Sequence, residues 1–303
     1  MAKVHVWLLY RGGPTQPSRL QQYFQRQMDD PHLLNLGTGL FARLWRSILI
    51  WWRGKEVAKL QLTGPCPSLQ SSEEQSRELN RILGSDYTCV AVHRYDGTNA
   101  HTRIKETPRG KPILLFPLVP FRSGVLYSTL ANARIQLESE GFDHHEIPPL
   151  SHLPSFVNIY AESIRESIIS LQGETDYAVL LLLSRDAKNW HSTSAELDAE
   201  IHLFCQVLTQ KLHRDLTIIA ALHIPDAVRK LQKLKEVSHI LYGYPFWICD
   251  SYETLPTSIG QMSFQFHRIP SLNTRPSFIR MLSDTIIQHS PTEQELPSPS
   301  VSS

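Results

Sequence analysis

Short apolar runs alternate with amphipathic stretches along nearly the whole chain, and this alternation limits the fold more than any other feature. It is typical of strand–helix units built around parallel sheets. The pattern predicts strands at 4–10, 87–93, 112–116, 177–183, 216–222 and 239–248. It predicts helices at 18–28, 123–139, 155–171, 194–212, 225–234 and 275–287. A further helix is expected to begin with a capping box at Ser71 and Glu74 and to run to about Leu83.

A proline-rich break at 147–154 divides this pattern into two similar halves, although no sequence repeat relates them. We therefore predict an α/β fold of two Rossmann-like halves, 1–150 and 151–288, each a parallel sheet flanked by helices. The tail at 289–303 is rich in Ser and Pro and is predicted to be disordered. Ligands of open α/β sheets bind beyond the carboxyl ends of the strands, so the loops after the strands are the candidate site.

Composition excludes several classes of protein. The 30 Lys and Arg residues nearly balance the 29 Asp and Glu residues, so we predict no nucleic-acid partner. No two cysteines form a CxxC pair, which argues against an iron–sulfur cluster and favours reduced thiols in a cytoplasmic protein. The first apolar run is short and leads into Gly12, Gly13 and Pro14, unlike a signal peptide, and no run has the length of a membrane-spanning helix. The cysteines are Cys66, Cys89, Cys205 and Cys249.

The segment 39–53 (GLFARLWRSILIWWR) predicts a helix with an apolar, tryptophan-rich face and a basic face. Arg43, Arg46 and Arg53 lie towards the basic side, whereas Trp45 belongs to the apolar side. Such a helix either packs into the core or lies partly exposed. A partly exposed helix of this kind lies at a bilayer interface or at the edge of an apolar ligand cleft. We expect partial exposure, as an apolar lip that touches the membrane surface from the cytoplasmic side.

Several motifs, in the right order over about residues 4–287, resemble the ferrochelatases, which insert ferrous iron into a porphyrin. LLYRGGP resembles the family's LLNLGGP turn, VAVHRYDG its GMRYW element, and LLFPLVPFRSG its LYPQYS-TTG loop. LLLLSRD stands where the family has LLFSAHGLP, and PFWICDSYETL resembles the stretch ending in DHIETL. IPSLN with a following Pro and Phe-Ile resembles the IPCLN segment. The resemblance implies a porphyrin cleft between the two halves.

The same resemblance suggests the catalytic residues, with one substitution at the centre. Glu253 matches the family's ETL glutamate, but Asp186 stands in place of the SAHGLP histidine, and Ser251 replaces the histidine of DH. A histidine suits proton abstraction and metal delivery near neutral pH, whereas an aspartate can act as a base or bind iron through oxygen. Either Asp186 takes that role or His191, further along the same loop, does so. Glu253 and Asp186 are the expected metal ligands.

The expected porphyrin-binding residues come from the loops that match the family and from the apolar lip. Arg11 occupies a turn position that faces the porphyrin in the family, where it either pairs with a propionate or obstructs the metal side. Arg94 and Tyr95, together with His93, keep a polar and aromatic cluster after a strand. Pro117 and Ser123 belong to the loop that resembles LYPQYS-TTG, and Trp45 belongs to the lip.

The resemblance implies a chelatase with ferrous iron as its substrate metal and no permanently bound cofactor. Three activities remain open at this point: a divergent ferrochelatase, a non-catalytic descendant that binds porphyrin or haem, and a chelatase for another tetrapyrrole or metal. The IPSLN and ETL motifs favour the ferrochelatase branch over the last of these.

Overall fold

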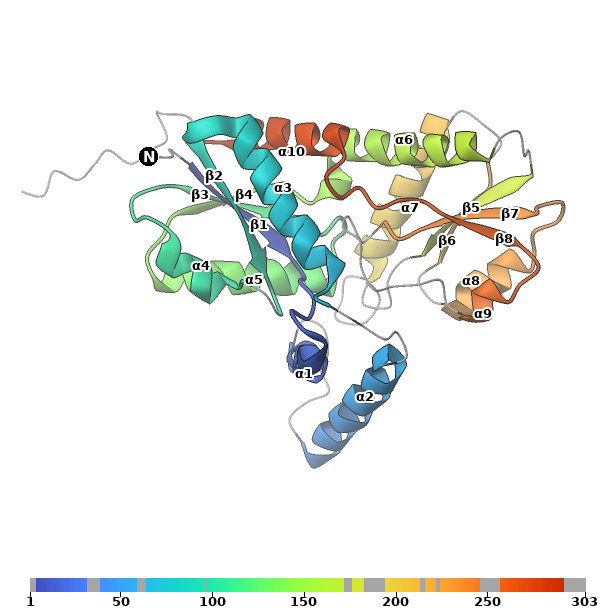
Figure 1. Ribbon diagram of the computed structural model, residues 1–303, viewed down its shortest axis with the longest axis horizontal. Coiled ribbons are helices and arrows are strands. Elements are labelled where there is room, and N and C mark those ends of the chain that lie inside the picture. Colours follow the sequence, from blue (N-terminus) through green and yellow to red (C-terminus); the bar gives the residue numbers. More distant parts are fainter. Residues whose placement is uncertain are drawn as a thin grey trace, which may run out of the picture.

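The protein forms two four-stranded parallel sheets with the same strand order, flanked and joined by helices (Figure 1). This computed structural model describes residues 4–31, 39–58, 64–95, 98–171, 176–182, 194–212, 216–221, 224–245 and 257–291. The first sheet has the order β2-β1-β3-β4 and the second has the order β6-β5-β7-β8. The two-half α/β architecture expected from the alternating pattern is therefore confirmed, and the halves repeat in topology although they do not repeat in sequence.

In the first half, the strands are β1 (Val4–Tyr10), β2 (Tyr87–His93), β3 (Ile113–Pro117) and β4 (His144–Glu146). The helices are α1 (Leu20–Met28), α2 (Leu40–Ala58), α3 (Pro67–Leu83), α4 (Ala100–Glu106) and α5 (Gly124–Ser139), with single turns η1 (Pro17–Arg19) and η2 (Gly84–Asp86). The turn η3 (Leu150–His152) then leads into α6 (Pro154–Ser170), which connects the halves.

In the second half, the strands are β5 (Tyr177–Leu182), β6 (Ile218–Ala221), β7 (His239–Gly243) and β8 (Gln265–Arg268). The helices are α7 (Ser194–Leu212), α8 (Ile224–Leu231), α9 (Thr257–Gly260) and α10 (Pro276–His289). Helix α10 returns along the top of the molecule in Figure 1 and packs against both α3 and α6, so this helix of the second half contacts the first half.

One large core joins the two sheets. Strand β1 is buried along its whole length, so its alternating side chains enter two different cores. Leu8 on one face belongs to a cluster that also holds Leu181 and Leu241 of the second sheet, whereas Trp7 on the other face packs with α1, α4 and α5. A third cluster lies between the far face of the second sheet and α8 and α9. Each sheet therefore gives one face to the shared core and one face to its own helices.

The start of α3 corrects one expectation. The helix begins at Pro67, the residue after Cys66, and no side chain caps it by a hydrogen bond. Proline is well suited to a first helical position because its fixed φ and missing N–H cost nothing there. Ser71 consequently lies inside the helix, and the capping-box prediction at this residue is wrong. The expected end at Leu83 is confirmed.

Candidate functional site

The strands of both sheets are parallel, so the loops that follow them gather at the carboxyl edge of each sheet. In the first half this edge carries the turn after β1, the residues after β2 and the loop after β3. In the second half, the segments after β5 and β7 carry Asp186, His191 and Glu253, which lie outside the described residues. Their proposed catalytic and metal-binding roles therefore remain predictions from the sequence.

The turn after β1 requires its two glycines. Gly12 has a positive φ of 80°, and the Tyr23 hydroxyl donates a hydrogen bond to its carbonyl at 3.0 Å. A Cβ atom on Gly13 would lie only 2.5 Å from the Cβ of Cys66, so no larger residue fits without movement. Arg11, partly buried at this turn, accepts the backbone N–H of Tyr95 through its carbonyl at 3.3 Å. The GGP motif thus positions Arg11 beside the residues that follow β2.

A fully buried carboxylate organises the residues after β2. Asp30 pairs with the Arg94 guanidinium at 2.8 Å, accepts the Tyr95 hydroxyl at 3.0 Å, and also accepts the Ser128 hydroxyl of α5. Arg94 donates in addition to Ser128, with Nε and Oγ 2.7 Å apart. The guanidinium group of Arg26 in α1 donates a hydrogen bond to the Tyr95 carbonyl at 2.6 Å. This network, here called the Asp30 network, joins α1, α5 and the carboxyl end of β2.

The contacts of the Asp30 network bear on the porphyrin-binding role that was predicted for Arg94 and Tyr95. Tyr95 is 1% exposed, and burial, followed by the charge of Asp30, raises the pKa of its hydroxyl well above the usual value. Tyr95 therefore remains a neutral hydrogen-bond donor. Arg94 keeps 23% of its side chain exposed while bound to Asp30. The described partners of both side chains belong to the protein itself, so the geometry favours a role in positioning the carboxyl edge of the first sheet. A direct contact of either residue with porphyrin stays a prediction.

His93 and Tyr10 belong to a second buried polar group on the other face of β1 and β2. The Nε2 atom of His93 lies 2.8 Å from the hydroxyl of Ser72, which also donates to the Leu69 carbonyl at 2.8 Å. Because the serine proton is used on Leu69, His93 donates to Ser72 through Nε2. The rings of Tyr10 and His93 are 5.8 Å apart. His93 is 2% exposed, which places it inside the protein between β2 and α3.

The IPSLN segment is held to the first half by a short hydrogen-bonded chain. The Tyr10 hydroxyl donates to Gln75 at 2.6 Å, and the amide nitrogen of Gln75 donates to the Asn273 carbonyl at 2.5 Å. Asn273 has a positive φ of 41°, a conformation that asparagine tolerates better than most residues. Arg275 then pairs with Glu166 of α6 at 2.5 Å. The motif that resembles the family most closely therefore fastens the end of β8 to α3 and α6.

The remaining predicted porphyrin-binding residues differ in their access to ligand. Pro117 ends β3 and is buried. Ser123 is 1% exposed and caps α5, since its hydroxyl accepts the Leu126 N–H at 3.4 Å. Trp45, by contrast, is 45% exposed on α2, which extends below the carboxyl ends of the first sheet in Figure 1. The structure brings Arg11, Arg94 and Tyr95 together and leaves Trp45 on a separate exposed helix.

Sequence reasoning missed one carboxylate that links the two halves. Glu200 of α7 accepts the backbone N–H of Arg122 at 2.9 Å and the hydroxyl of Ser151, and it lies 3.1 Å from Nε2 of His152. Its side chain is only 11% exposed. These contacts tie the second half to the loop after β3, next to the candidate site. Nothing in the helical sequence around Glu200 distinguishes it from an ordinary surface acid.

Among the described residues, no group of three or more His, Cys, Asp and Glu side chains is placed to hold a metal ion. The expected iron ligands Glu253 and Asp186 lie outside that part of the chain. None of the helices that were searched, which cover only described residues, is long and apolar enough to cross a bilayer.

Two parallel sheets of identical strand order, joined by one core and carrying loops at their carboxyl edges, form a two-half α/β fold. The sequence model of the family described as Ferrochelatase matches residues 3–187. A ferrochelatase of Aquifex aeolicus (strain VF5) is 21% identical over 323 residues, covering 94% of this chain and 98% of that protein. The chain belongs to the ferrochelatase family, a family of metal chelatases.

Among solved structures, SirB from Bacillus subtilis with Fe3+ is similar with a TM-score of 0.49 and 8% sequence identity. That alignment covers 71% of this chain and 88% of the SirB chain.

Proposed function

We propose that this protein is a ferrochelatase-type metal chelatase that inserts ferrous iron into a porphyrin during haem synthesis. The observation that carries the proposal is the family match over residues 3–187, which spans the first half, α6, β5 and the segment with Asp186. The relative from Aquifex aeolicus extends the similarity over 94% of the chain. Family membership supports a chelatase, whereas the choice of porphyrin and iron belongs to the proposal.

The chemistry assigned to this chain rests on its carboxylates. Metal insertion must remove two pyrrole protons and deliver a desolvated divalent ion to the ring nitrogens. In the proposal, Glu253 accepts a proton, and Asp186 takes the position of the family histidine as base and oxygen ligand for iron. His191 is the alternative base on the same segment. The Asp30 network and Glu200 hold the surrounding edge in place without touching the reacting atoms.

A second function, that of a pseudoenzyme, is favoured by one specific observation. Asp186 and Ser251 stand where the family has histidines, and loss of a central base lowers a rate by about 10²–10⁴-fold. Such a descendant would keep the cleft and bind porphyrin or haem as a carrier, sensor or partner subunit.

A paired measurement on one purified sample separates the two functions. Protoporphyrin IX binding is followed by Soret titration, and ferrous insertion is then measured anaerobically. The proposal expects binding and turnover, with turnover falling at least 100-fold in Glu253→Gln. Asp186→Asn and His191→Ala then show which side chain replaces the missing base. Glu162→Gln, which removes an exposed carboxylate of α6, is the matched control and should keep full activity.

The possible results divide clearly. Binding with turnover that depends on Glu253 supports the enzyme, and binding without turnover supports the pseudoenzyme. Absence of porphyrin binding would refute the enzyme, and absence of both porphyrin and haem binding would refute both functions.

We also propose that α2 contacts a membrane surface through its apolar face. Among the described side chains of this helix, Trp45 is 45% exposed and Trp51 is 59% exposed, and α2 contacts the rest of the protein mainly through α1. Arg46 anchors the helix by an ion pair with Asp29 at 3.3 Å. Leu40, Phe41, Leu44 and Ile48 are also exposed along this face. An exposed apolar patch beside basic residues is typical of a docking surface.

Vesicle flotation tests this membrane contact. The full chain should float with vesicles of neutral and anionic phospholipid, and the double variant Trp45→Ser/Trp51→Ser should lose most of that binding. Ile169→Ser removes an apolar side chain that is 75% exposed on α6 and serves as the control. Equal flotation of all three proteins, or no flotation of the unaltered chain, would contradict membrane contact through α2.

A further inference from the structure

The loop that follows β3 leaves the first half for three residues and then returns to it. At its start, the Leu118 N–H donates to the Leu9 carbonyl of β1 at 2.9 Å, and at its end Ser123 caps α5. Between these two anchors, residues 120–122 contact the turn η3 and helix α7 instead. This three-residue stretch, here called the docked stretch, therefore joins the carboxyl edge of the first sheet to the second half.

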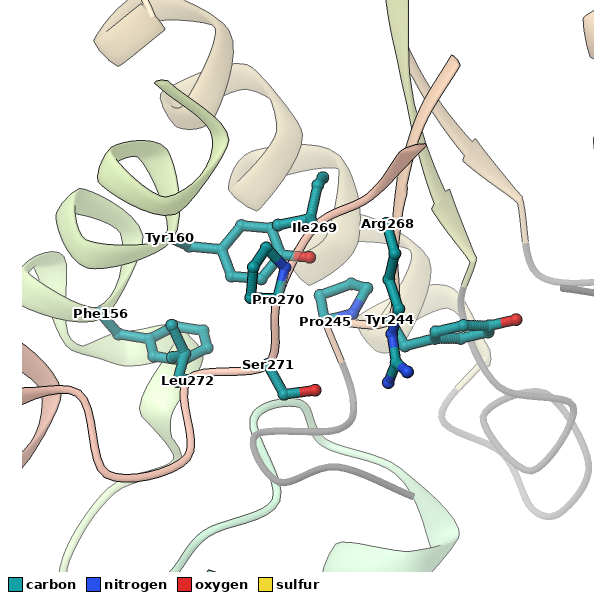
Figure 2. A pocket seen from close by; sticks show the side chains of 9 residues that line it. All are labelled: Phe156, Tyr160, Tyr244, Pro245, Arg268, Ile269, Pro270, Ser271 and Leu272. Carbon is teal, nitrogen blue, oxygen red and sulfur yellow. The ribbon is translucent and has the colours of Figure 1, made fainter. Parts of the chain in front are cut away.

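An aromatic cluster holds the middle of the docked stretch. Phe121 is 0% exposed, and its ring meets that of Phe204 in α7 edge to face, with the ring centroids 5.2 Å apart. Phe204 also contacts the rings of Phe156 and Tyr160 in α6, at centroid distances of 6.1 and 5.7 Å. Figure 2 shows that Phe156 and Tyr160 line a small pocket together with the IPSLN segment. Phe121 therefore belongs to the core that α6, α7 and the IPSLN segment share, and it fixes the docked stretch by apolar contact.

A ring of hydrogen bonds fixes the residues on both sides of Phe121. The Pro120 carbonyl accepts the Ser151 N–H at 2.9 Å, and the Ser151 hydroxyl donates to Glu200 of α7. Glu200 in turn accepts the Arg122 N–H at 2.9 Å, which closes the ring. The Glu200 side chain is 11% exposed, and both of these donors come from outside its own helix. Because a carboxylate buried this deeply is stable only with hydrogen-bond donors, Glu200 favours the docked arrangement of the loop.

Helix α7 also carries the end of the segment that follows β5. The helix begins at Ser194, shortly after Asp186 and His191 in the sequence, and Glu200 lies near this start. The loop after β3 and the proposed catalytic segment are therefore attached to the same end of one helix.

We propose that Glu200 is a positioning residue that docks residues 120–122 onto α7, so that this stretch keeps its place relative to the second half when the two halves move. The Asp30 network instead holds the residues after β2, Arg94 and Tyr95, to α1 and α5 of the first half. The carboxyl edge of the first sheet is therefore divided between the two halves. The effect on a ligand rests on the proposed function, because the ligand that this edge would contact is a porphyrin. A loop that leaves its docked position lowers the apparent affinity for such a ligand, since only the docked fraction of the protein binds it.

Hydrogen exchange of the full chain, followed by mass spectrometry, tests the docking without any ligand. Glu200→Ala removes the acceptor of the Arg122 N–H, so exchange in residues 118–123 should become about tenfold faster. Glu200→Gln keeps one carbonyl oxygen, and exchange should stay within about twofold of that in the unaltered protein. Asp198→Ala removes an exposed acid of the same helix, and Ile219→Val lowers the overall stability from the far face of the second sheet. Neither of these two control variants should change exchange in the loop.

Soret titration with protoporphyrin IX and anaerobic ferrous insertion then test the positioning role. Kd should rise about fivefold in Glu200→Ala, because part of the protein then lacks the docked loop, and Glu200→Gln should restore Kd to within about twofold. At saturating porphyrin, kcat should change less than about twofold, so the loss should be seen in KM. A general loss of stability would lower the active fraction, and with it kcat, while KM stayed unchanged. The two control variants should keep both values.

The two measurements distinguish the docking from the proposed function. Unchanged exchange in Glu200→Ala, or equally fast exchange in Ile219→Val, would refute the docking. Faster exchange in Glu200→Ala alone, with no binding of porphyrin or haem by the unaltered protein, would support the docking and refute the proposed function. Faster exchange with an unchanged Kd, in a protein that does bind porphyrin, would refute the positioning role of Glu200.

Discussion

Replacement of Asp30 by Asn should destabilise the protein strongly, because this carboxylate is the buried centre of a network of three side chains. The Asp30 side chain is fully buried and lies 2.8 Å from the Arg94 guanidinium, which is 23% exposed. Breaking a buried ion pair costs about 3–5 kcal/mol. Asn keeps the shape and one carbonyl oxygen, and Arg94 can partly rehydrate, so we expect a loss of about 2–3 kcal/mol.

Urea unfolding followed by circular dichroism measures this loss by linear extrapolation. Asp29→Asn is the matched control, because the neighbouring carboxylate is 53% exposed and pairs with Arg46 at 3.3 Å. Its loss should cost less than about 0.5 kcal/mol. Combining Asp30→Asn with Arg94→Gln should give a coupling energy of about 1–2 kcal/mol. A loss below about 1 kcal/mol for Asp30→Asn, or no coupling, would refute the view that Asp30 holds the edge after β2.

Three further predictions concern other parts of the structure. Gly13→Ala should lower the free energy of unfolding in urea by about 1–3 kcal/mol, because the new Cβ atom would collide with the Cβ atom of Cys66. Adding Cys66→Ala should restore little of that stability, since alanine keeps the Cβ atom. An unchanged urea midpoint for Gly13→Ala would contradict this prediction. Burial raises the pKa of Cys89 from 9.0 to about 12, so the folded state holds the proton more tightly and loses stability as pH rises above 9. Between pH 7 and pH 10, the free energy of unfolding should fall by about 1 kcal/mol more in the unaltered protein than in Cys89→Ala. Equal losses in the two proteins would argue against burial of the Cys89 thiol as the cause of the pH dependence. Glu200→Ala removes the acceptor for Arg122 and should cost about 2 kcal/mol, whereas a cost near zero would show that the link between the halves is weak.

The long elements of the fold could be predicted because each is buried in a regular pattern. The strand at 4–10, the strand at 87–93 and the helix at 194–212 agree with the predicted bounds. The short edge elements β4 and β8, and the small helices α4 and α9, were not predicted. Strand β4 is a three-residue polar segment at the sheet edge, so it lacks the apolar alternation that identifies a strand.

The candidate site was predicted unevenly for a similar reason. The motifs after β1 and β2 marked Arg11, Arg94 and Tyr95, and these residues do lie together. Their partner Asp30 and the link at Glu200 could not be predicted, because each is an ordinary acid in its local sequence. Partners such as Arg94 and Asp30, separated by 64 positions, meet only after the chain has folded.

The sequence by itself determined the class of fold, the division into halves and the family, since these depend on periodicity and on short ordered motifs. The tertiary structure decided which polar residues are buried and what each of them touches. Tyr160 illustrates the difference: in the sequence it is one aromatic residue of an amphipathic helix, whereas in the fold its hydroxyl is enclosed against β7. Local patterns follow from neighbouring residues, but burial and hydrogen bonding between distant segments depend on how all the elements pack together.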